Sequence, residues 1–236
     1  MFIVKTLLGL VWFILASILG FLYALLRWGS TDTNHHYGKW FSWGILKVFG
    51  VEIKLEHPEF LDLHSPCVYA VNHQSNLDLL TYAAICPRNT VVIGKKELLW
   101  IPLFGLYYVA AGNLLIHRQV ARRAQAGLMQ AIEKVMQKKV SIWIFPEGTR
   151  NLSGVGMLPF KRGAFVMAIK CQIPIVPIVG GPLSAFIDWR RLEVKSKVYP
   201  IRVLDPISTQ GMTEKDVPLL MNQTREQMLK AYHELS

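Results

Sequence analysis

Residues 140–150 read Val-Ser-Ile-Trp-Ile-Phe-Pro-Glu-Gly-Thr-Arg, an apolar run that ends at a proline and is followed by charged and small residues. A short, continuous apolar run bounded by a proline is typical of a buried strand. In α/β sheets, ligands bind at the loops that follow the ends of the strands. This stretch therefore predicts a buried strand that presents Glu147, Gly148, Thr149 and Arg150 on a ligand-binding loop.

Outward from this strand, short β-rich runs alternate with helical patterns from residue 51 onward. Alternation of this kind predicts a mixed α/β sheet flanked by helices. We expect strands at residues 51–56, 66–71, 90–93, 113–116, 140–145, 174–179 and 199–204. We expect helices at residues 76–85, 119–139 and 162–171, and a final amphipathic helix at 213–235 that Pro218 interrupts.

The first fifty residues have a different character. Residues 6–26 carry no charge, and a helix of that length measures about 31 Å, enough to cross a hydrocarbon core. A second apolar stretch at 37–50 is too short to span, but its tryptophans and lysines suit a membrane interface. Two arrangements stay open: a spanning helix followed by an interfacial one, or a helical hairpin held in one leaflet, which we favour. A cleaved signal peptide fits poorly, because the apolar region is too long.

Composition bounds the class of protein. The chain has 236 residues, of which 52% are hydrophobic and 18% charged, which favours a folded domain over disorder. We expect a domain at 51–236 after anchoring helices at 1–50. The three cysteines, Cys67, Cys86 and Cys171, lack metal-ligand spacing, which predicts buried, reduced thiols and no metal site.

The net charge of +10 indicates an anionic partner. Nucleic acid is disfavoured because no helix-turn-helix, zinc-finger or RNP-type pattern accompanies the charge. The apolar N-terminus favours lipid headgroups or a phosphorylated lipid.

A second candidate site lies at the expected strand-to-helix turn after residue 71. The segment Asn72-His-Gln-Ser-Asn-Leu-Asp78 lets His73 and Asp78 converge if Ser75 or Asn76 caps the helix. An imidazole oriented by a carboxylate is the arrangement that a general base needs to take a proton from an alcohol. The same residues also fit a helix-capping aspartate beside a solvated histidine.

The loop after residue 145 offers a matching anion site. Gly148 lets the backbone approach an anion, and Arg150 offers a bidentate grip on phosphate. Taken alone, Glu147 and Arg150 also fit a structural ion pair.

The two motifs together resemble the glycerolipid acyltransferase family, in which NHQSNLD at 72–78 and FPEGTR at 145–150 have counterparts. Further similar motifs are GKKELLWIPLFG at 94–105, GNLLIHR at 112–118, LPFKRGAF at 158–165 and IPIVPI at 173–178. The resemblance extends from the N-terminal helix to about Leu204. It implies the glycerolipid acyltransferase fold for the α/β domain and a catalytic role for residues 51–236.

The resemblance implies roles residue by residue. His73 is implied as the base and Asp78 as its orienting partner. Arg150, Lys95 and Arg118 are implied as phosphate ligands. Lys96 is the alternative to Lys95, which we favour, and either lysine also fits a solvated surface position. Glu147, Gly148 and Thr149 are implied to shape the acceptor site. One departure is His117, where family members commonly carry Asp, so Arg118 lacks the acidic partner that orients it.

The implied activity is transfer of a fatty acyl chain from acyl-CoA or acyl carrier protein to the sn-2 hydroxyl of lysophosphatidic acid, which forms phosphatidic acid. The acyl thioester is a substrate, so no cofactor is expected. The implied partners are these substrates and membrane lipids. The implied location is the bacterial inner membrane, with the catalytic domain on the cytoplasmic face. Alternatives are another lysophospholipid acceptor, a thioester hydrolase, or a non-catalytic lipid-binding protein.

Overall fold

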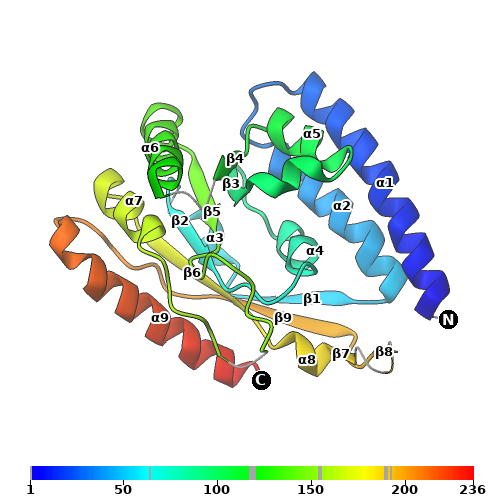
Figure 1. Ribbon diagram of the computed structural model, residues 1–236. Helices are drawn as coiled ribbons and strands as arrows, with labels where there is room; N and C mark the ends of the chain where they lie inside the picture. Colours follow the sequence, from blue (N-terminus) through cyan, green and yellow to red (C-terminus); the bar gives the residue numbers. More distant parts are fainter. Residues whose placement is uncertain (1, 64, 117–120, 154–155, 189–190, 192) are drawn as a thin grey trace.

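The computed structural model describes residues 2–63, 65–116, 121–153, 156–188, 191 and 193–236. Within them, a seven-stranded sheet forms the centre of the molecule, in the spatial order β1-β9-β6-β2-β5-β3-β4 (Figure 1). Its strands are β1 (Glu52–Glu56), β2 (Val68–Val71), β3 (Thr90–Lys95), β4 (Leu114–Ile116), β5 (Ser141–Ile144), β6 (Ile175–Gly180) and β9 (Val198–Val203). Each expected strand is therefore present, with ends shifted by one or two residues.

The direction of the strands sets where the loops gather. The four adjacent strands β6, β2, β5 and β3 are parallel to one another, and β4 is parallel to β3. β9 is antiparallel to β6 and parallel to β1, so the sheet is mixed, as predicted. Because the carboxyl ends of parallel strands meet at one edge, the loops after β2, β5 and β6 come together there with the end of β3.

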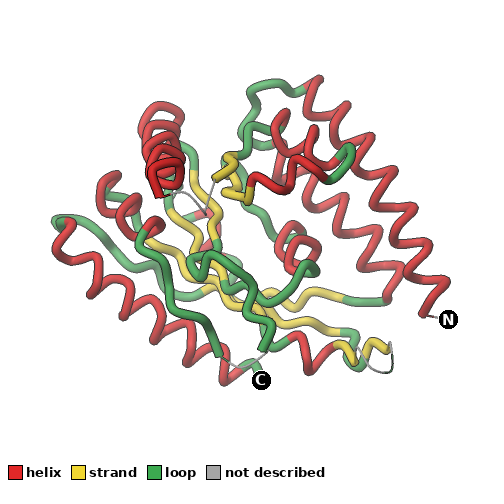
Figure 2. Tube along the Cα trace, viewed as in Figure 1, coloured by secondary structure: helices red, strands yellow, loops and turns green. Residues whose placement is uncertain are grey.

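Side chains alternate between the two faces of the sheet. On β2, Val68 and Ala70 belong to one apolar core, and Tyr69 and Val71 belong to the other. The first core packs under α6 (Ala121–Lys138), α7 (Gly163–Cys171) and α9 (Val217–Glu234), which cover one face in Figure 2. The short helices α3 (Glu59–Asp62) and α4 (Asp78–Ala83) contribute to the second core.

Several short elements were not expected from the sequence. They are the helices α3, α5 (Phe104–Ala110) and α8 (Leu183–Phe186), the 3-10 turns η1 (Lys96–Trp100) and η2 (Glu214–Asp216), and the strand pair β7 (Ile187–Asp188) and β8 (Glu193–Val194). The prediction that Pro218 interrupts the last helix was wrong. Pro218 lies in the first turn of α9, directly after Val217, where a missing N–H costs no intrahelical bond, so the proline does not interrupt the helix.

The N-terminal residues form two long helices, α1 (Phe2–Leu26) and α2 (Thr33–Phe49), side by side on the outer layer beyond α4 (Figure 1). The inner face of α1 carries small buried residues: Gly9, Ala16, Ser17, Gly20 and Ala24. A side chain at Gly20 would meet the Tyr37 ring at 2.2 Å, so the two helices touch closely. The outer face is apolar and exposed, from Ile3 to Leu26. Among the described helices, α1 is long and apolar enough to cross a membrane.

A buried polar cluster ties α2 to the sheet. The Asn34 amide donates to the carbonyl oxygen of Thr90 at 2.9 Å and to Oδ1 of Asn113 at 2.7 Å, and it accepts from the Tyr107 hydroxyl at 2.9 Å. Asn113 Oδ1 also accepts from the backbone N–H of Val92 on β3. These buried side-chain hydrogen bonds hold α2 against the α/β core, in addition to the covalent connection of the chain.

Candidate active site

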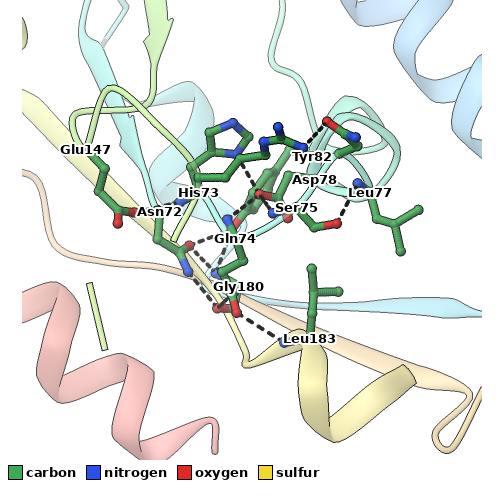
Figure 3. A network of polar contacts seen from close by, with 12 residues as sticks. Asn72, His73, Gln74, Ser75, Leu77, Asp78, Tyr82, Glu147, Gly180 and Leu183 are labelled. Atoms are coloured by element: carbon green, nitrogen blue, oxygen red, sulfur yellow. Dashed lines mark hydrogen bonds and ion pairs between the residues drawn. The ribbon is translucent and has the colours of Figure 1, made fainter. Parts of the chain in front are cut away.

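The segment between β2 and α4 brings His73 and Asp78 together. Nδ1 of His73 lies 2.7 Å from Oδ2 of Asp78, and the aspartate side chain is fully buried (Figure 3). A carboxylate only accepts hydrogen bonds, so Nδ1 carries the proton and Nε2 is left as the free basic nitrogen. This is the geometry that the sequence analysis anticipated for a general base.

The local backbone explains how residues five apart converge. Oδ2 of Asp78 also accepts from the backbone N–H groups of Gln74 at 2.6 Å and Ser75 at 2.9 Å, which curls the segment around the carboxylate. The expectation that Ser75 or Asn76 caps the helix was wrong, because α4 begins after Leu77 and the cap makes no side-chain hydrogen bond. The aspartate in the first turn of α4 organises the turn instead.

The His73 ring is also fixed from the side. It stacks on Phe145, with ring centres 4.2 Å apart and planes 23° from parallel. Only 17% of the His73 side chain is exposed, and it lines a cavity of about 640 Å³. The imidazole is therefore held in one orientation at the wall of a space large enough for a lipid chain.

Glu147 holds the backbone of this segment. Its Oε1 accepts from the backbone N–H of His73 at 2.8 Å, and its Oε2 accepts from that of Leu158 at 2.8 Å. The side chain is 2% exposed. Both oxygens accept from backbone N–H groups, and Arg150 bonds Asn76 instead, so the two residues do not form the ion pair considered from the sequence.

Arg150 and Lys95 bring positive charge to the cavity. Arg150 donates from Nη1 to Oδ1 of Asn76 at 2.8 Å, which uses one of five guanidinium donors. Lys95, at the end of β3, lines the cavity, whereas Lys96 lies outside its lining and opens η1. Of the two lysines, Lys95 is therefore the one placed to meet a ligand.

Three further residues were expected at the site: Gly148, Thr149 and Arg118. Gly148 has φ of 72°, in the left-handed region that favours glycine, and forms the turn after β5. Thr149 is exposed on the same loop. Arg118 and the neighbouring His117 lie outside the described residues.

Within the described ranges, no group of three or more His, Cys, Asp or Glu side chains is arranged to hold a metal ion.

Away from these polar groups, the cavity is apolar. It extends from His73, Arg150 and Lys95 to α1 and α2, where Leu10, Phe13 and other apolar side chains line it. A polar end with a base and cations, continuous with an apolar interior, suits an amphipathic ligand with an anionic head.

Comparison with known proteins identifies the family of this chain. The family model described as "Acyltransferase" matches residues 52–180, from β1 to the end of β6. This chain belongs to the acyltransferase family. A relative named 1-acyl-sn-glycerol-3-phosphate acyltransferase from Haemophilus influenzae is 34% identical and covers 94% of this chain and 91% of its own length. Its namesake from Escherichia coli is 32% identical and covers 100% and 94%.

A longer human relative, 1-acyl-sn-glycerol-3-phosphate acyltransferase alpha, is 38% identical over 80% of this acyltransferase, which spans 66% of the human chain. Among solved structures, the lysophosphatidic acid acyltransferase PlsC from Thermotoga maritima superposes with a TM-score of 0.75 at 22% identity. The match covers 99% of this chain and 96% of that one. This likeness shows that the acyltransferase fold, including the N-terminal helices, is shared.

Further polar residues, to which the sequence assigned no role, surround His73 and Asp78 in the candidate site. Asn72 bonds the backbone of Gly180, and Gln74 donates to the carbonyl oxygen of Gly181 at 2.9 Å and accepts from the N–H of Leu183 at 3.1 Å. Both lie inside the 72–78 motif, but the sequence does not reveal their partners, which lie at the end of β6 and in the residues that follow it. Tyr82 joins them from α4, and its spacing of four residues from Asp78 was the available signal.

The buried carboxyl of Glu147 gives a prediction about pH. Burial raises its pKa above the ordinary 4.5, against the lowering effect of the His73 and Leu158 N–H groups. Because the folded pKa exceeds the unfolded one, the stabilisation from this group is complete below pH 4.5 and is lost as the pH rises through the raised value. We expect the wild type to lose melting temperature relative to Glu147→Gln as the pH rises above 4.5.

Asp216 serves as the control, because its contribution to stability changes with pH in the opposite direction. The pKa of Asp216 is lowered by the N–H of Thr213, so its stabilisation is present above the ordinary 3.8 and is lost at lower pH. Asp216→Asn should therefore differ from wild type by a constant amount above pH 4.5. Melting curves of the three proteins in one detergent give the comparison, and a wild-type advantage over Glu147→Gln that grows with pH contradicts the assignment.

Proposed function

We propose that this acyltransferase moves a fatty acyl chain from acyl-CoA or acyl carrier protein to the sn-2 hydroxyl of lysophosphatidic acid, forming phosphatidic acid. The observation that carries the proposal is the His73 imidazole, held by Asp78 at 2.7 Å, at the polar end of an otherwise apolar cavity. The names of the Haemophilus influenzae and Escherichia coli relatives support the same acceptor.

In the proposed reaction, Nε2 of His73 takes the proton of the acceptor hydroxyl as its oxygen attacks the thioester carbonyl. A carbon–oxygen bond forms, the carbon–sulfur bond breaks, and the leaving thiolate recovers the proton from the imidazolium. Asp78 stabilises that imidazolium and holds its tautomer. The proton balance closes with these groups alone, so the proposal includes no metal or other cofactor and no acyl-enzyme.

Acceptor recognition is assigned to the cations. We propose that Arg150 binds the phosphate in bidentate fashion and that Lys95 and Arg118 add charge. Glu147, Gly148 and Thr149 shape this acceptor site through the loop that carries Arg150, and Glu147 does so by fixing the backbone of His73. A single-chain lipid then places its acyl chain along the apolar lining, away from water.

The test is a comparison of acceptors with purified protein, one labelled acyl thioester and detergent micelles. We expect phosphatidic acid from lysophosphatidic acid, with much lower turnover of lysophosphatidylcholine and of glycerol 3-phosphate. Faster acylation of lysophosphatidylcholine contradicts the assigned acceptor. Running acyl-CoA and acyl carrier protein in parallel identifies the donor, which the proposal leaves as either thioester.

We also propose that residues 1–50 anchor the enzyme as a hairpin in one leaflet of the bacterial inner membrane, with the domain at 51–236 on the cytoplasmic face. The exposed apolar side of α1 and the interfacial Trp28 and Trp43 support this placement. A cytoplasmic domain keeps the site near its thioester donor.

The anchor gives a prediction. Membrane-bound protein should resist extraction by high salt and carbonate, because apolar burial is not screened, whereas attachment by net charge alone is removed. In intact cells, a Phe2→Cys variant should resist a membrane-impermeant thiol reagent, with Cys67, Cys86 and Cys171 replaced by serine to remove background. Labelling of Phe2→Cys from outside contradicts the hairpin and means that α1 crosses the bilayer.

A further inference from the structure

Tyr82 lies beside the His73–Asp78 pair without belonging to either motif. It follows Asp78 by four residues on α4, so both side chains leave the same face of the helix, toward the strand ends. Asn72, directly before His73, follows Val71, the last residue of β2. Figure 3 shows the Tyr82 side chain and the Asn72 amide meeting the backbone of Gly180.

The contacts among these three residues form a closed set. The Tyr82 hydroxyl donates to Oδ1 of Asn72 at 2.5 Å. The backbone N–H of Gly180 reaches Oδ1 of Asn72 at 2.9 Å and the Tyr82 oxygen at 3.0 Å. Nδ2 of Asn72 donates to the Gly180 carbonyl at 3.0 Å. These hydrogen bonds connect three elements: α4, which carries Asp78, the end of β2, which precedes His73, and the end of β6.

The surroundings are shaped around this hydroxyl. Tyr82 is 2% exposed, and burial raises the pKa of its phenol above the ordinary value, so the group keeps its proton and donates. A side chain at Gly180 would stand 2.6 Å from the Tyr82 hydroxyl, a separation that real Cβ atoms do not show. The close approach therefore requires glycine at the end of β6.

We propose that Tyr82 is a positioning residue for acyl transfer: through Asn72, its hydroxyl fixes the helix bearing Asp78 against the strand end bearing His73. The His73–Asp78 contact joins two elements and needs both in register, because a misplacement of about 1 Å costs on the order of a hundredfold in rate. The inference rests on the proposed function, since positioning is defined by the reaction it serves. The Tyr82 ring also lines the cavity, and a change to phenylalanine leaves that wall in place.

The experiment compares Tyr82→Phe with Tyr199→Phe. Tyr199 is equally buried at the same sheet edge, but its hydroxyl donates to the Gly181 carbonyl at 2.9 Å rather than to Asn72. We expect Tyr82→Phe to lower kcat about 10- to 100-fold, with KM for both substrates within about twofold. We expect Tyr199→Phe to retain kcat within about twofold. Both variants should melt within about 4 °C of wild type.

A second variant removes the Tyr82–Asn72 hydrogen bond by changing its acceptor. Asn72→Ser removes the acceptor of the Tyr82 hydroxyl and leaves the Tyr82 ring packed, so it should give the same fall in kcat. It decides the question if Tyr82→Phe does not fold. Equal kcat in Tyr82→Phe and Tyr199→Phe, or a rise in KM in place of the fall in kcat, overturns the inference. Failure of wild type to transfer the acyl chain instead overturns the proposed function, so the two failures are distinguishable.

Discussion

His73→Ala is expected to lower the rate of acyl transfer about 10²- to 10⁴-fold, the usual cost of losing a general base. The side chain contacts Asp78 and Phe145 and stays partly exposed, so its removal should leave the fold intact. Initial rates with saturating donor and acceptor give the comparison, and a melting curve confirms folding.

Asp78→Asn should also reduce the rate severely, because a neutral amide supports the imidazolium poorly. His57→Ala is the matched control: that histidine is exposed, contacts Glu59 and Phe60 through its ring, and does not line the cavity. Substantial activity in folded His73→Ala protein contradicts the base assignment, and a similar loss in His57→Ala shows a non-specific effect.

Arg150→Ala is expected to raise KM for lysophosphatidic acid about 10- to 100-fold while KM for the acyl thioester stays nearly unchanged. The loss follows from removing a charge-assisted contact to phosphate, which contributes about 1.5–3 kcal/mol. Arg150→Lys should recover only part of it, because a lysine offers no planar fork.

Arg162→Ala serves as the control for charge, since Arg162 is exposed, lies near Arg150 in the chain and does not line the cavity. Steady-state kinetics with each substrate varied in turn separate the two KM values. An increase in KM for the donor, with acceptor KM unchanged, places Arg150 in the thioester site and contradicts the assignment.

Most of the sheet was predictable because its strands are uninterrupted apolar runs, such as residues 141–144 and 175–180, buried on both faces. Short elements were not, since two-residue strands at 187–188 and 193–194 carry no periodicity. Pro218 was placed inside a helix because the pattern continues on both sides of it. The 3-10 turn that precedes α9 depends on the Thr213 and Asp216 side chains, whose reciprocal bonds the periodicity does not reveal.

The site was predictable to the extent that its chemistry lies within two motifs. His73 and Asp78 meet as the strand-to-helix turn suggested. The position of Glu147 was clear, but its partners are backbone N–H groups of His73 and Leu158, which no side-chain pattern encodes. The Tyr82–Gly180 contact joins residues 98 apart, so it needs the register of β2 and β6.

The most direct measurement of the central claim follows the acyl group itself. Purified protein is mixed with a labelled acyl thioester, first alone and then with lysophosphatidic acid added. Direct attack of the acceptor hydroxyl predicts no label on the protein and little free fatty acid in the first stage, then label in phosphatidic acid in step with thiol release. Label bound covalently to the protein, or fatty acid released at the same rate with and without acceptor, contradicts the mechanism.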